Sequence, residues 1–221
     1  SNKMHGTSFV TSKVLIKKRL NFVQKFLSKF FPIVDTEYGL LYSSRMVIKN
    51  QNYLVKGDNG GFYKEDVWKL VADKLDPVLK AGISVYGEIV GYTPSGKWIQ
   101  KNYDYGCKEG EYDFYVYRVT VTTPTGDTYE FSDSQAREWA LKNGVKFVKQ
   151  YYYGKAKDMF PEISVDEHWH ENVLNKLIEL YLEKDCDMCV VEPNIPSEGV
   201  VIRKDNVHDY EAFKLKSFRF L

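Results

Sequence analysis

The chain has 221 residues, 43% of them hydrophobic and 15% aromatic, which is enough for a substantial buried core. Its formal net charge is +1, so the chain as a whole is not strongly basic, although seven Lys and Arg residues and no acid precede Asp35. The chain has three cysteines, no run of about 18 apolar residues and no signal-peptide pattern. These features argue against a disulfide framework, a membrane-spanning protein and a secreted one, so we expect a cytoplasmic protein. We also expect a monomer.

The first pattern in the chain is basic and apolar. Within residues 14–31 apolar side chains recur at three- and four-residue spacing with Lys and Arg between them, which predicts a basic amphipathic helix in part of this stretch. This helix would either be a solvated face over core residues or contact RNA. Residues 32–38 break the pattern, and residues 39–48 are rich in β-forming side chains, which predicts a strand.

The middle of the chain predicts a turn, a helix and a strand. A glycine-rich turn is expected at residues 56–61. Residues 62–79 carry apolar side chains on one helical face, and the helix should end near Pro77. Residues 83–92 predict a strand, and residues 93–111 an irregular loop.

The rest of the chain alternates strands and helices. Residues 112–121 alternate like a strand, and a turn at 124–127 leads into a second strand at 128–131. Ser132 or Ser134 should cap a helix over 135–142 that ends at Asn143 and Gly144, and Ser164 should cap a longer helix over 165–184. Two strands are expected at 199–203 and 211–218. These elements together predict a single α+β domain with mainly antiparallel sheets.

Four short segments place charged groups among apolar, strand-like residues, where an unpaired charge would be costly to bury. They are Lys3-Met4-His5-Gly6, Tyr86-Gly87-Glu88, residues 197–203 with Glu198, and residues 213–217 with Lys214 and Lys216. Strand alternation puts Lys214 and Lys216 on one face, where two ammonium groups indicate an anionic ligand.

The two acids also suit a ligand. Glu88 and Glu198 each lie beside a glycine at a strand edge, as expected for carboxylates directed at ribose hydroxyls or a divalent metal ion. Gly6, three residues after Lys3, would let the backbone approach a ligand closely. A lysine that can act as a nucleophile, two acids and a lysine pair fit phosphoryl chemistry, although the residues alone leave open which reaction.

The order and spacing of these motifs resemble a known superfamily. Lys-x-x-Gly at Lys3, Arg45 in a strand, Tyr-Gly-Glu at Glu88, Glu-Gly-Val-Val-Ile-Arg at Glu198 and Lys-Leu-Lys at Lys214 resemble the motifs of the covalent nucleotidyltransferases, which include RNA ligases, DNA ligases and capping enzymes. Lys-Met-His-Gly-Thr is similar to the first motif of the RNA ligase 2 family. Residues 98–105 and 113–117 also resemble segments of these ligases, so the resemblance covers nearly the whole chain.

This resemblance implies a nucleotidyltransferase fold of mainly antiparallel sheets with flanking helices and a central nucleotide cleft, formed by residues 1–221 as one catalytic domain. The implied activity is that of an ATP-dependent RNA ligase in RNA repair, which carries AMP on a lysine, transfers it to an RNA 5′-phosphate and joins that end to a 3′-hydroxyl. The implied ligands are ATP, Mg²⁺ or Mn²⁺, and RNA. Because the family has a strand before the nucleophile, we expect further segments, such as an OB-fold domain, outside this sequence.

The resemblance also implies roles for individual residues. Lys3 would be the nucleophile, and His5 would serve the later, RNA-dependent steps. Glu198 would hold the metal ion, while Lys214 and Lys216 would hold the α-phosphate of ATP.

Three further residues would complete the ligand contacts. Arg45 would hold the ribose and the RNA phosphate side, Glu88 would bind a ribose hydroxyl, and Tyr117 would stack on the adenine. Tyr117 and Tyr86 could instead be ordinary sheet aromatics.

Other functions stay open at this point. The chain could be a DNA ligase, a GTP-using capping enzyme, or a non-catalytic RNA-binding module of the same fold. Cys186 and Cys189 have the spacing of half a zinc site, but no second ligand pair matches them.

Overall fold

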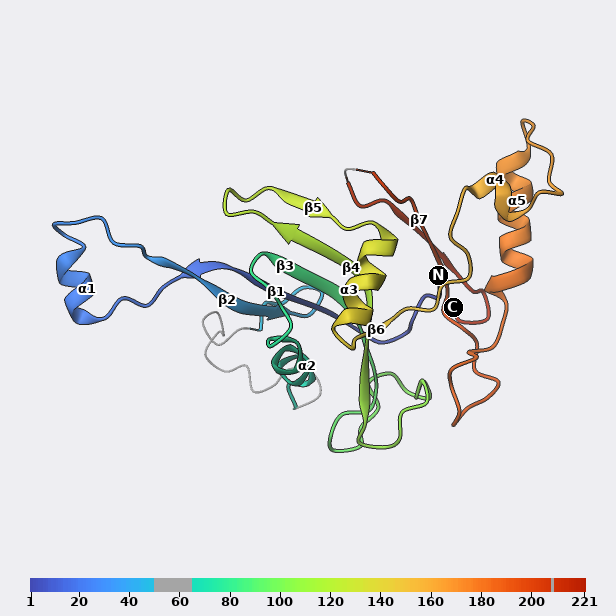
Figure 1. The fold of residues 1–221 in the computed structure, drawn as a ribbon. Coiled ribbons are helices and arrows are strands. Elements are labelled where there is room, and N and C mark those ends of the chain that lie inside the picture. The colour runs from blue at the N-terminus through green and yellow to red at the C-terminus, as the bar shows by residue number, and fades with distance from the viewer. Residues whose placement is uncertain (50–64, 208) are drawn as a thin grey trace. The chain divides into compact units, whose positions relative to one another are not determined.

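The computed structural model describes residues 1–49, 65–207 and 209–221, so the turn predicted at 56–61 lies outside the described residues. The described part is a mixture of helices and strands with mainly antiparallel strand pairs (Figure 1). The predicted α+β class is thereby confirmed, whereas the nucleotidyltransferase fold stays a prediction. None of its helices has the length and apolar character needed to cross a membrane.

The chain divides into two compact units. Unit 1 comprises Ser1–Thr7, Glu88–Tyr117 and Ser132–Leu221, and unit 2 comprises Ser8–Gly87 and Arg118–Phe131. The prediction that residues 1–221 form one catalytic domain stays a prediction.

Among the described residues, six strands form one sheet with the order β2-β1-β3-β4-β5, and β6 pairs with β4. The pairs β1–β2 and β4–β5 are antiparallel, whereas β6 is parallel to β4. A second sheet consists of the antiparallel pair β7 and β8. The strands are β1 (Thr7–Lys17), β2 (Thr36–Ser43), β3 (Ile83–Gly91), β4 (Tyr112–Thr122), β5 (Thr128–Glu130), β6 (Lys146–Phe147), β7 (Gly199–Arg203) and β8 (Ala212–Lys216).

The helices of the described part are short. They are α1 (Phe22–Leu27), α2 (Val67–Leu75), α3 (Asp133–Lys142), α4 (Ala156–Met159), α5 (Trp169–Leu177) and the π-helix η2 (Ile178–Leu182). The long helix predicted over 165–184 therefore begins later than expected, at Trp169, and changes to a π-helix before it ends. The short helix α4 and strand β6 were not predicted.

Helix α2 packs the core of unit 2. Asp66 caps its N-terminus by accepting a hydrogen bond from the backbone N of Lys69 at 2.9 Å. Trp68 is buried, and its Nε1 donates to the carbonyl of Ser8 in β1 at 3.1 Å. The predicted helix is thus confirmed over Val67–Leu75 and ends two residues before Pro77, whereas residues 62–64 of the prediction lie outside the described residues.

The start of the chain differs from its prediction. Residues 7–17 form strand β1, and the helix expected within 14–31 shrinks to the six residues of α1. The reason is that β1 buries alternate side chains, such as Phe9 and Thr11, against the sheet, so its pairing with β2 outweighs the helical spacing of its apolar residues. A helix in part of this stretch is thus confirmed, but it covers only Phe22–Leu27, and residues 14–17 belong to β1.

Helix α3 of unit 1 confirms its prediction closely. Ser132 is the N-cap, and its hydroxyl accepts from the backbone N of Gln135 at 3.2 Å while the Gln135 side chain accepts from the backbone N of Ser132 at 2.9 Å. This reciprocal pair is a capping box. At the other end Gly144 adopts a φ of 64°, the left-handed conformation that commonly ends a helix.

Candidate functional site

The candidate site of unit 1 is built on the β7–β8 pair. The first residues of the chain run along the free edge of β7: the backbone N of Lys3 donates to the carbonyl of Gly199 at 3.0 Å, and Asn2 forms a bridge with Val200. On the other side of β7, Gly199 is paired with Lys216 of β8. Residues from the two ends of the chain are thereby placed side by side by backbone hydrogen bonds.

A buried carboxylate lies at the centre of this arrangement. Glu198 is 5% exposed, and its Oε1 forms an ion pair with Nζ of Lys3, 195 residues away in sequence. Nζ of Lys216 lies 3.7 Å from the same oxygen, and Nδ1 of His5 lies 3.6 Å from Oε2. The structure therefore brings together four of the residues predicted for the site.

Two opposing influences set the pKa of Glu198. Burial is the largest single influence and raises the pKa, but the hydrogen bonds from His5 and Lys3 and the positive charge of Lys3 lower it further than burial raises it. The net result is a pKa below the ordinary value of 4.5. At neutral pH the carboxylate is therefore ionised and available to cations.

This lowered pKa gives a testable dependence of stability on pH. Because the folded-state pKa lies below the ordinary value of 4.5, ionised Glu198 stabilises the fold above pH 4.5, and that contribution is lost as the pH falls through the folded-state pKa. We expect the difference in free energy of unfolding between the wild type and Glu198→Gln to shrink as the pH falls below the ordinary pKa value of 4.5. Urea denaturation at several pH values measures it, and a difference that stays constant would contradict the ionic role of Glu198.

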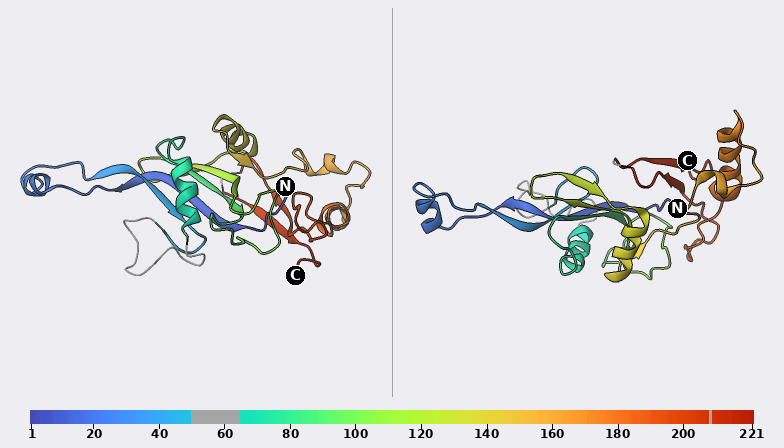
Figure 2. Two further views of the ribbon diagram at one scale, coloured as in Figure 1. Left: turned by 90° about the horizontal axis from the view of Figure 1, so that it is seen from below. Right: turned by 45° about the horizontal axis from the view of Figure 1, so that its top comes forward.

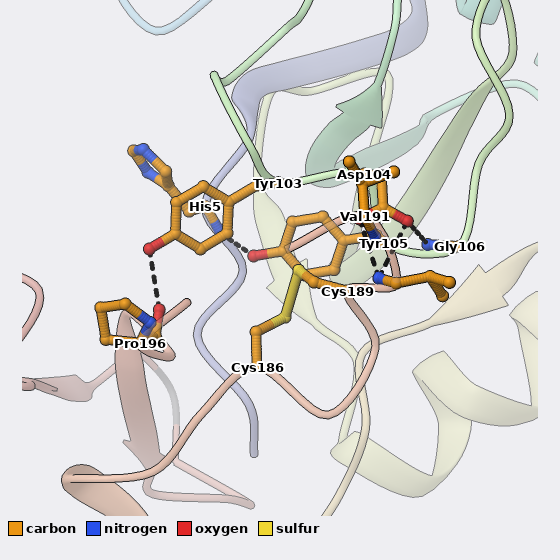
Figure 3. Close-up of a disulfide and its surroundings, with 10 residues drawn as sticks. His5, Tyr103, Asp104, Tyr105, Gly106, Cys186, Cys189, Val191 and Pro196 are labelled. Carbon is orange, nitrogen blue, oxygen red and sulfur yellow. Dashed lines mark hydrogen bonds between the residues drawn. A yellow bond between two sulfur atoms is a disulfide. The ribbon is translucent and has the colours of Figure 1, made fainter. Parts of the chain in front are cut away.

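Two tyrosines hold the segment that carries Lys3 and His5 (Figure 3). The Tyr105 hydroxyl accepts a hydrogen bond from the backbone N of His5 at 2.6 Å. The His5 ring packs edge-on against Tyr103, with 4.9 Å between ring centroids, and against Phe220, with 4.8 Å. His5 is thus oriented by aromatic packing on two sides.

The pKa of Tyr105 is raised, mainly by burial; the hydrogen bond from His5 lowers it, and the charges of Glu198 and Glu88 raise it again. The hydroxyl therefore stays protonated.

The loop before Glu198 is tied to the same tyrosine segment. The Tyr103 hydroxyl donates to the carbonyl of Pro196 at 2.7 Å. The carboxylate of Asp104, which is 1% exposed, accepts from the backbone N of Val190 at 2.9 Å and of Val191 at 3.1 Å. These contacts fix the loop that leads into Glu198, so residues 103–105 position both partners of the Lys3–Glu198 ion pair.

Cys186 and Cys189 form a disulfide within this loop (Figure 3). Both are buried in one apolar cluster with Met4, Tyr103 and Tyr105. The sequence had left them as half of a zinc site; the structure pairs them with each other instead. No group of three or more His, Cys, Asp or Glu side chains suited to a metal ion occurs in residues 1–49, 65–207 and 209–221.

Gly6 has a packing reason to be glycine. A Cβ atom at this position would collide with the carbonyl oxygen of Ile89 and would lie 2.9 Å from Cγ1 of Val90, both in β3. The carbonyl of Gly6 accepts a hydrogen bond from Nε2 of Gln100 at 3.0 Å. The close approach expected at Gly6 is therefore made to a neighbouring strand; an approach to a ligand stays a prediction.

The remaining predicted site residues of unit 1 lie near this cluster. Glu88 is half-buried in β3, close enough for its charge to affect Tyr105. Tyr117 is partly buried in β4 and packs against the same apolar cluster as Tyr105. Lys214 lies two residues before Lys216 on the same face of β8; it is exposed and forms no ion pair within the described part of the chain. The roles of these residues stay predictions.

Arg45 belongs to unit 2, and the strand predicted at 39–48 instead spans Thr36–Ser43, so it does not include Arg45. Strand β2 ends at Ser43, and the backbone N of Ser44 donates to the carbonyl of Val47 at 3.0 Å, so Arg45 lies exposed in a tight turn. The side chains of 39–48 are β-formers, but this hydrogen bond closes the chain on itself and ends the strand early.

Sequence patterns missed the residues that support the site. Tyr103, Asp104 and Tyr105 lie in the stretch 98–105, which resembles a segment of these ligases. That resemblance did not predict which residues their side chains would contact. The one available signal was a charged residue between two aromatic ones, since a carboxylate in such a place is either exposed or held by hydrogen bonds.

The described part of the chain is thus an α+β protein in which Lys3, His5 and Lys216 lie within 4 Å of the buried carboxylate of Glu198. Residues 1–216 match the profile of the family described as RNA ligase, and the chain therefore belongs to the RNA ligase family. The predicted resemblance to RNA ligases is confirmed.

Comparison with solved structures finds the apo form of a mutant of the RNA ligase R4a from Naegleria gruberi, with 12% sequence identity and a TM-score of 0.46. The match covers 98% of this chain and 48% of that one, so the chain spans about half the length of that protein. No curated protein matches the chain.

Proposed function

We propose that the chain is the nucleotidyltransferase domain of an ATP-dependent RNA ligase that forms a covalent lysyl-AMP intermediate on Lys3. The observation that carries the proposal is the ion pair between Lys3 and the buried Glu198, with Lys216 and His5 within 4 Å of the same carboxylate. A lone surface lysine would have no such surroundings. Membership of the RNA ligase family supports RNA as the substrate class.

The proposed reaction has three steps. The lone pair of Lys3 Nζ attacks the α-phosphorus of ATP, a P–N bond forms, and pyrophosphate leaves as the P–O bond breaks. The AMP then passes to the 5′-phosphate of an RNA, and the 3′-hydroxyl of a second end displaces AMP to join the strands. Because an ammonium group has no lone pair, the ion pair between Lys3 and Glu198 must open and Lys3 must lose a proton before the first step.

The side chains around Glu198 fit a phosphate ligand. Lys216 supplies positive charge next to a buried acid, and Lys214 on the same face of β8 would add a second ammonium group for the α-phosphate. In the same proposal Glu88 and Arg45 bind the ribose and phosphate groups, and Tyr117 stacks on the adenine.

Glu198 is also the residue that would hold Mg²⁺ or Mn²⁺. Its environment fits: Mg²⁺ is commonly bound by one or two carboxylates together with substrate phosphates and water, and a cage of several protein ligands is not required. When bound, a divalent ion would neutralise charge on the phosphates. The chain's own contribution is the ionised carboxylate, which the contacts from Lys3 and His5 keep deprotonated.

The deciding experiment is incubation of the chain with α-labelled ATP and Mg²⁺, followed by a denaturing gel. We expect a labelled protein band that is lost in acid and resists alkali, as a P–N bond to lysine requires. A band formed with labelled GTP and not with ATP would indicate a capping-type enzyme, sealing of nicked DNA but not RNA would indicate a DNA ligase, and no band with either nucleotide would indicate a non-catalytic module.

His5 allows the later steps to be separated from the first. We expect His5→Ala to form the adduct within about fivefold of the wild type, because the Lys3–Glu198 ion pair remains, while sealing falls on the order of 10²-fold, as for loss of a catalytic acid or base. Adduct formation is measured without RNA and sealing with labelled RNA ends. His168→Ala, an exposed histidine, is the control. An equal loss of both activities would place His5 in the nucleotide pocket.

A further inference from the structure

A second charged surface lies in unit 2, at the end of the two-stranded ribbon of β1 and β2. We define the tip segment as residues 18–35, which contain α1 and connect Lys17 of β1 to Thr36 of β2, paired in antiparallel register. Figure 2 shows α1 at the distal end of this ribbon in both views.

The tip segment exposes large apolar side chains. Helix α1 has no buried residue, although a capping box between Asn21 and Gln24 fixes its start. The Phe22 side chain is 86% exposed, and the rings of Phe26 and Phe30 lie 5.4 Å apart. The exposed apolar residues of the segment are Phe22, Val23, Phe26, Leu27, Phe30, Phe31 and Val34. So many exposed aromatic rings in one short segment indicate a binding surface.

The same segment is strongly basic. The tip segment contains four basic residues and one acid, Asp35, which gives a local charge of +3 in a chain whose net charge is +1. The basic residues are Lys18, Arg19, Lys25 and Lys29, and all but Lys18 are exposed. This charge favours an anionic partner such as a polyanion.

Basic side chains and exposed aromatic rings in one segment fit single-stranded nucleic acid. Its phosphates attract the cations, and its unpaired bases stack on the rings, whereas a duplex keeps its bases covered. RNA is the polyanion on which the proposed function acts. We propose that the tip segment binds single-stranded RNA; the choice of RNA rests on the proposed function, but the binding itself does not require the chemistry at Lys3.

The structure permits variants that leave the rest of the fold in place. Since α1 buries no side chain, substitutions in the tip segment leave the packing of the core unchanged. The register also allows the whole segment to be replaced: an Asn-Gly turn can join Lys17 to Thr36 directly, because a two-residue turn closes an antiparallel pair of this kind.

The experiment measures binding of the 221-residue chain to a fluorescein-labelled, single-stranded 12-nucleotide RNA by fluorescence anisotropy at several salt concentrations. Three variants are compared with the wild type: Phe22, Phe26 and Phe30 all changed to Ser; Lys18, Arg19, Lys25 and Lys29 all changed to Gln; and the Asn-Gly replacement. A matched control changes four exposed lysines elsewhere, Lys80, Lys108, Lys155 and Lys157, to Gln. Thermal unfolding checks that each variant is folded.

We expect the phenylalanine variant to bind about 10²-fold more weakly or worse, because removing each base stack costs several-fold or more in affinity. In the charge variant the slope of log affinity against log salt should fall by up to about 3, at about 0.7 for each phosphate of a single strand that the variant no longer neutralises. The Asn-Gly variant should show both changes, and the control neither.

Adduct formation with labelled ATP is measured on the same proteins. Normal adduct formation with weakened RNA binding in the tip variants supports the inference, whereas a wild type without adduct that still binds RNA through the tip segment would reject only the proposed chemistry. Wild-type RNA affinity in all three variants would overturn the inference. Flotation with vesicles containing phosphatidylserine, lost in the variants while RNA affinity is unchanged, would overturn it in favour of a lipid surface.

Discussion

Replacing Lys3 with alanine is expected to abolish the covalent protein–AMP adduct while the chain stays folded. The nucleophile is removed, but Glu198 keeps His5 and Lys216 as neighbours, so the buried carboxylate is not left without a positive group. We expect labelling with ATP and Mg²⁺ to fall below detection, and thermal unfolding to show a cooperative transition as in the wild type.

A matched variant separates charge from nucleophilicity. Lys3→Arg keeps a positive group opposite Glu198, but a guanidinium stays protonated and cannot attack phosphorus. It should therefore be as inactive as Lys3→Ala. Lys142→Ala, in which an exposed lysine paired with Glu138 is removed, should label normally. Full labelling of either Lys3 variant would place the nucleophile elsewhere.

The second large effect is expected at the lysine pair of β8. Lys216→Ala and Lys214→Ala should each slow adduct formation on the order of 10²-fold or more, comparable to removal of one preorganised group that stabilises transition-state charge. The Lys216 side chain is 46% exposed, but its Nζ lies 3.7 Å from the buried Glu198, where Coulomb attraction is stronger than between two fully solvated charges.

The controls for this pair are lysines of the tip segment. Lys25→Ala and Lys29→Ala remove exposed charges and should leave adduct formation without RNA near normal. Single-turnover labelling with ATP gives the rates. If Lys214→Ala labels normally and Lys216→Ala does not, the phosphate role belongs to Lys216 alone.

Local sequence signals predicted the elements whose structure is decided locally. The N-cap serine, with Ser132 and Ser134 as candidates, and the glycine at 144 are read directly from neighbouring residues, and both ends of α3 were correct within two residues. The strand at residues 14–17 was missed because these residues satisfy helical spacing and strand pairing alike, and only the partner strand β2 decides between them.

The candidate site was predictable in its members but not in its geometry. Lys3, His5, Glu198 and Lys216 came from the motif resemblance, which carries no distances. The sequence could not show that Tyr105 accepts a hydrogen bond from His5 or that Asp104 accepts one from Val190. These hydrogen bonds join residues that are 100 and 86 positions apart. Such contacts depend on the assembled fold, and no local pattern contains them.

The edge position of the first three residues along β7 has a consequence for how the protein is made. Lys3 finds its backbone partner only when Gly199 is present, and β7 is paired only when β8 has been added. During synthesis on the ribosome Lys3 therefore emerges 195 residues before Glu198, its ion-pair partner. Contacts of such high sequence separation favour slow folding, and a chain that ends before Lys216 would carry the lysine without its site.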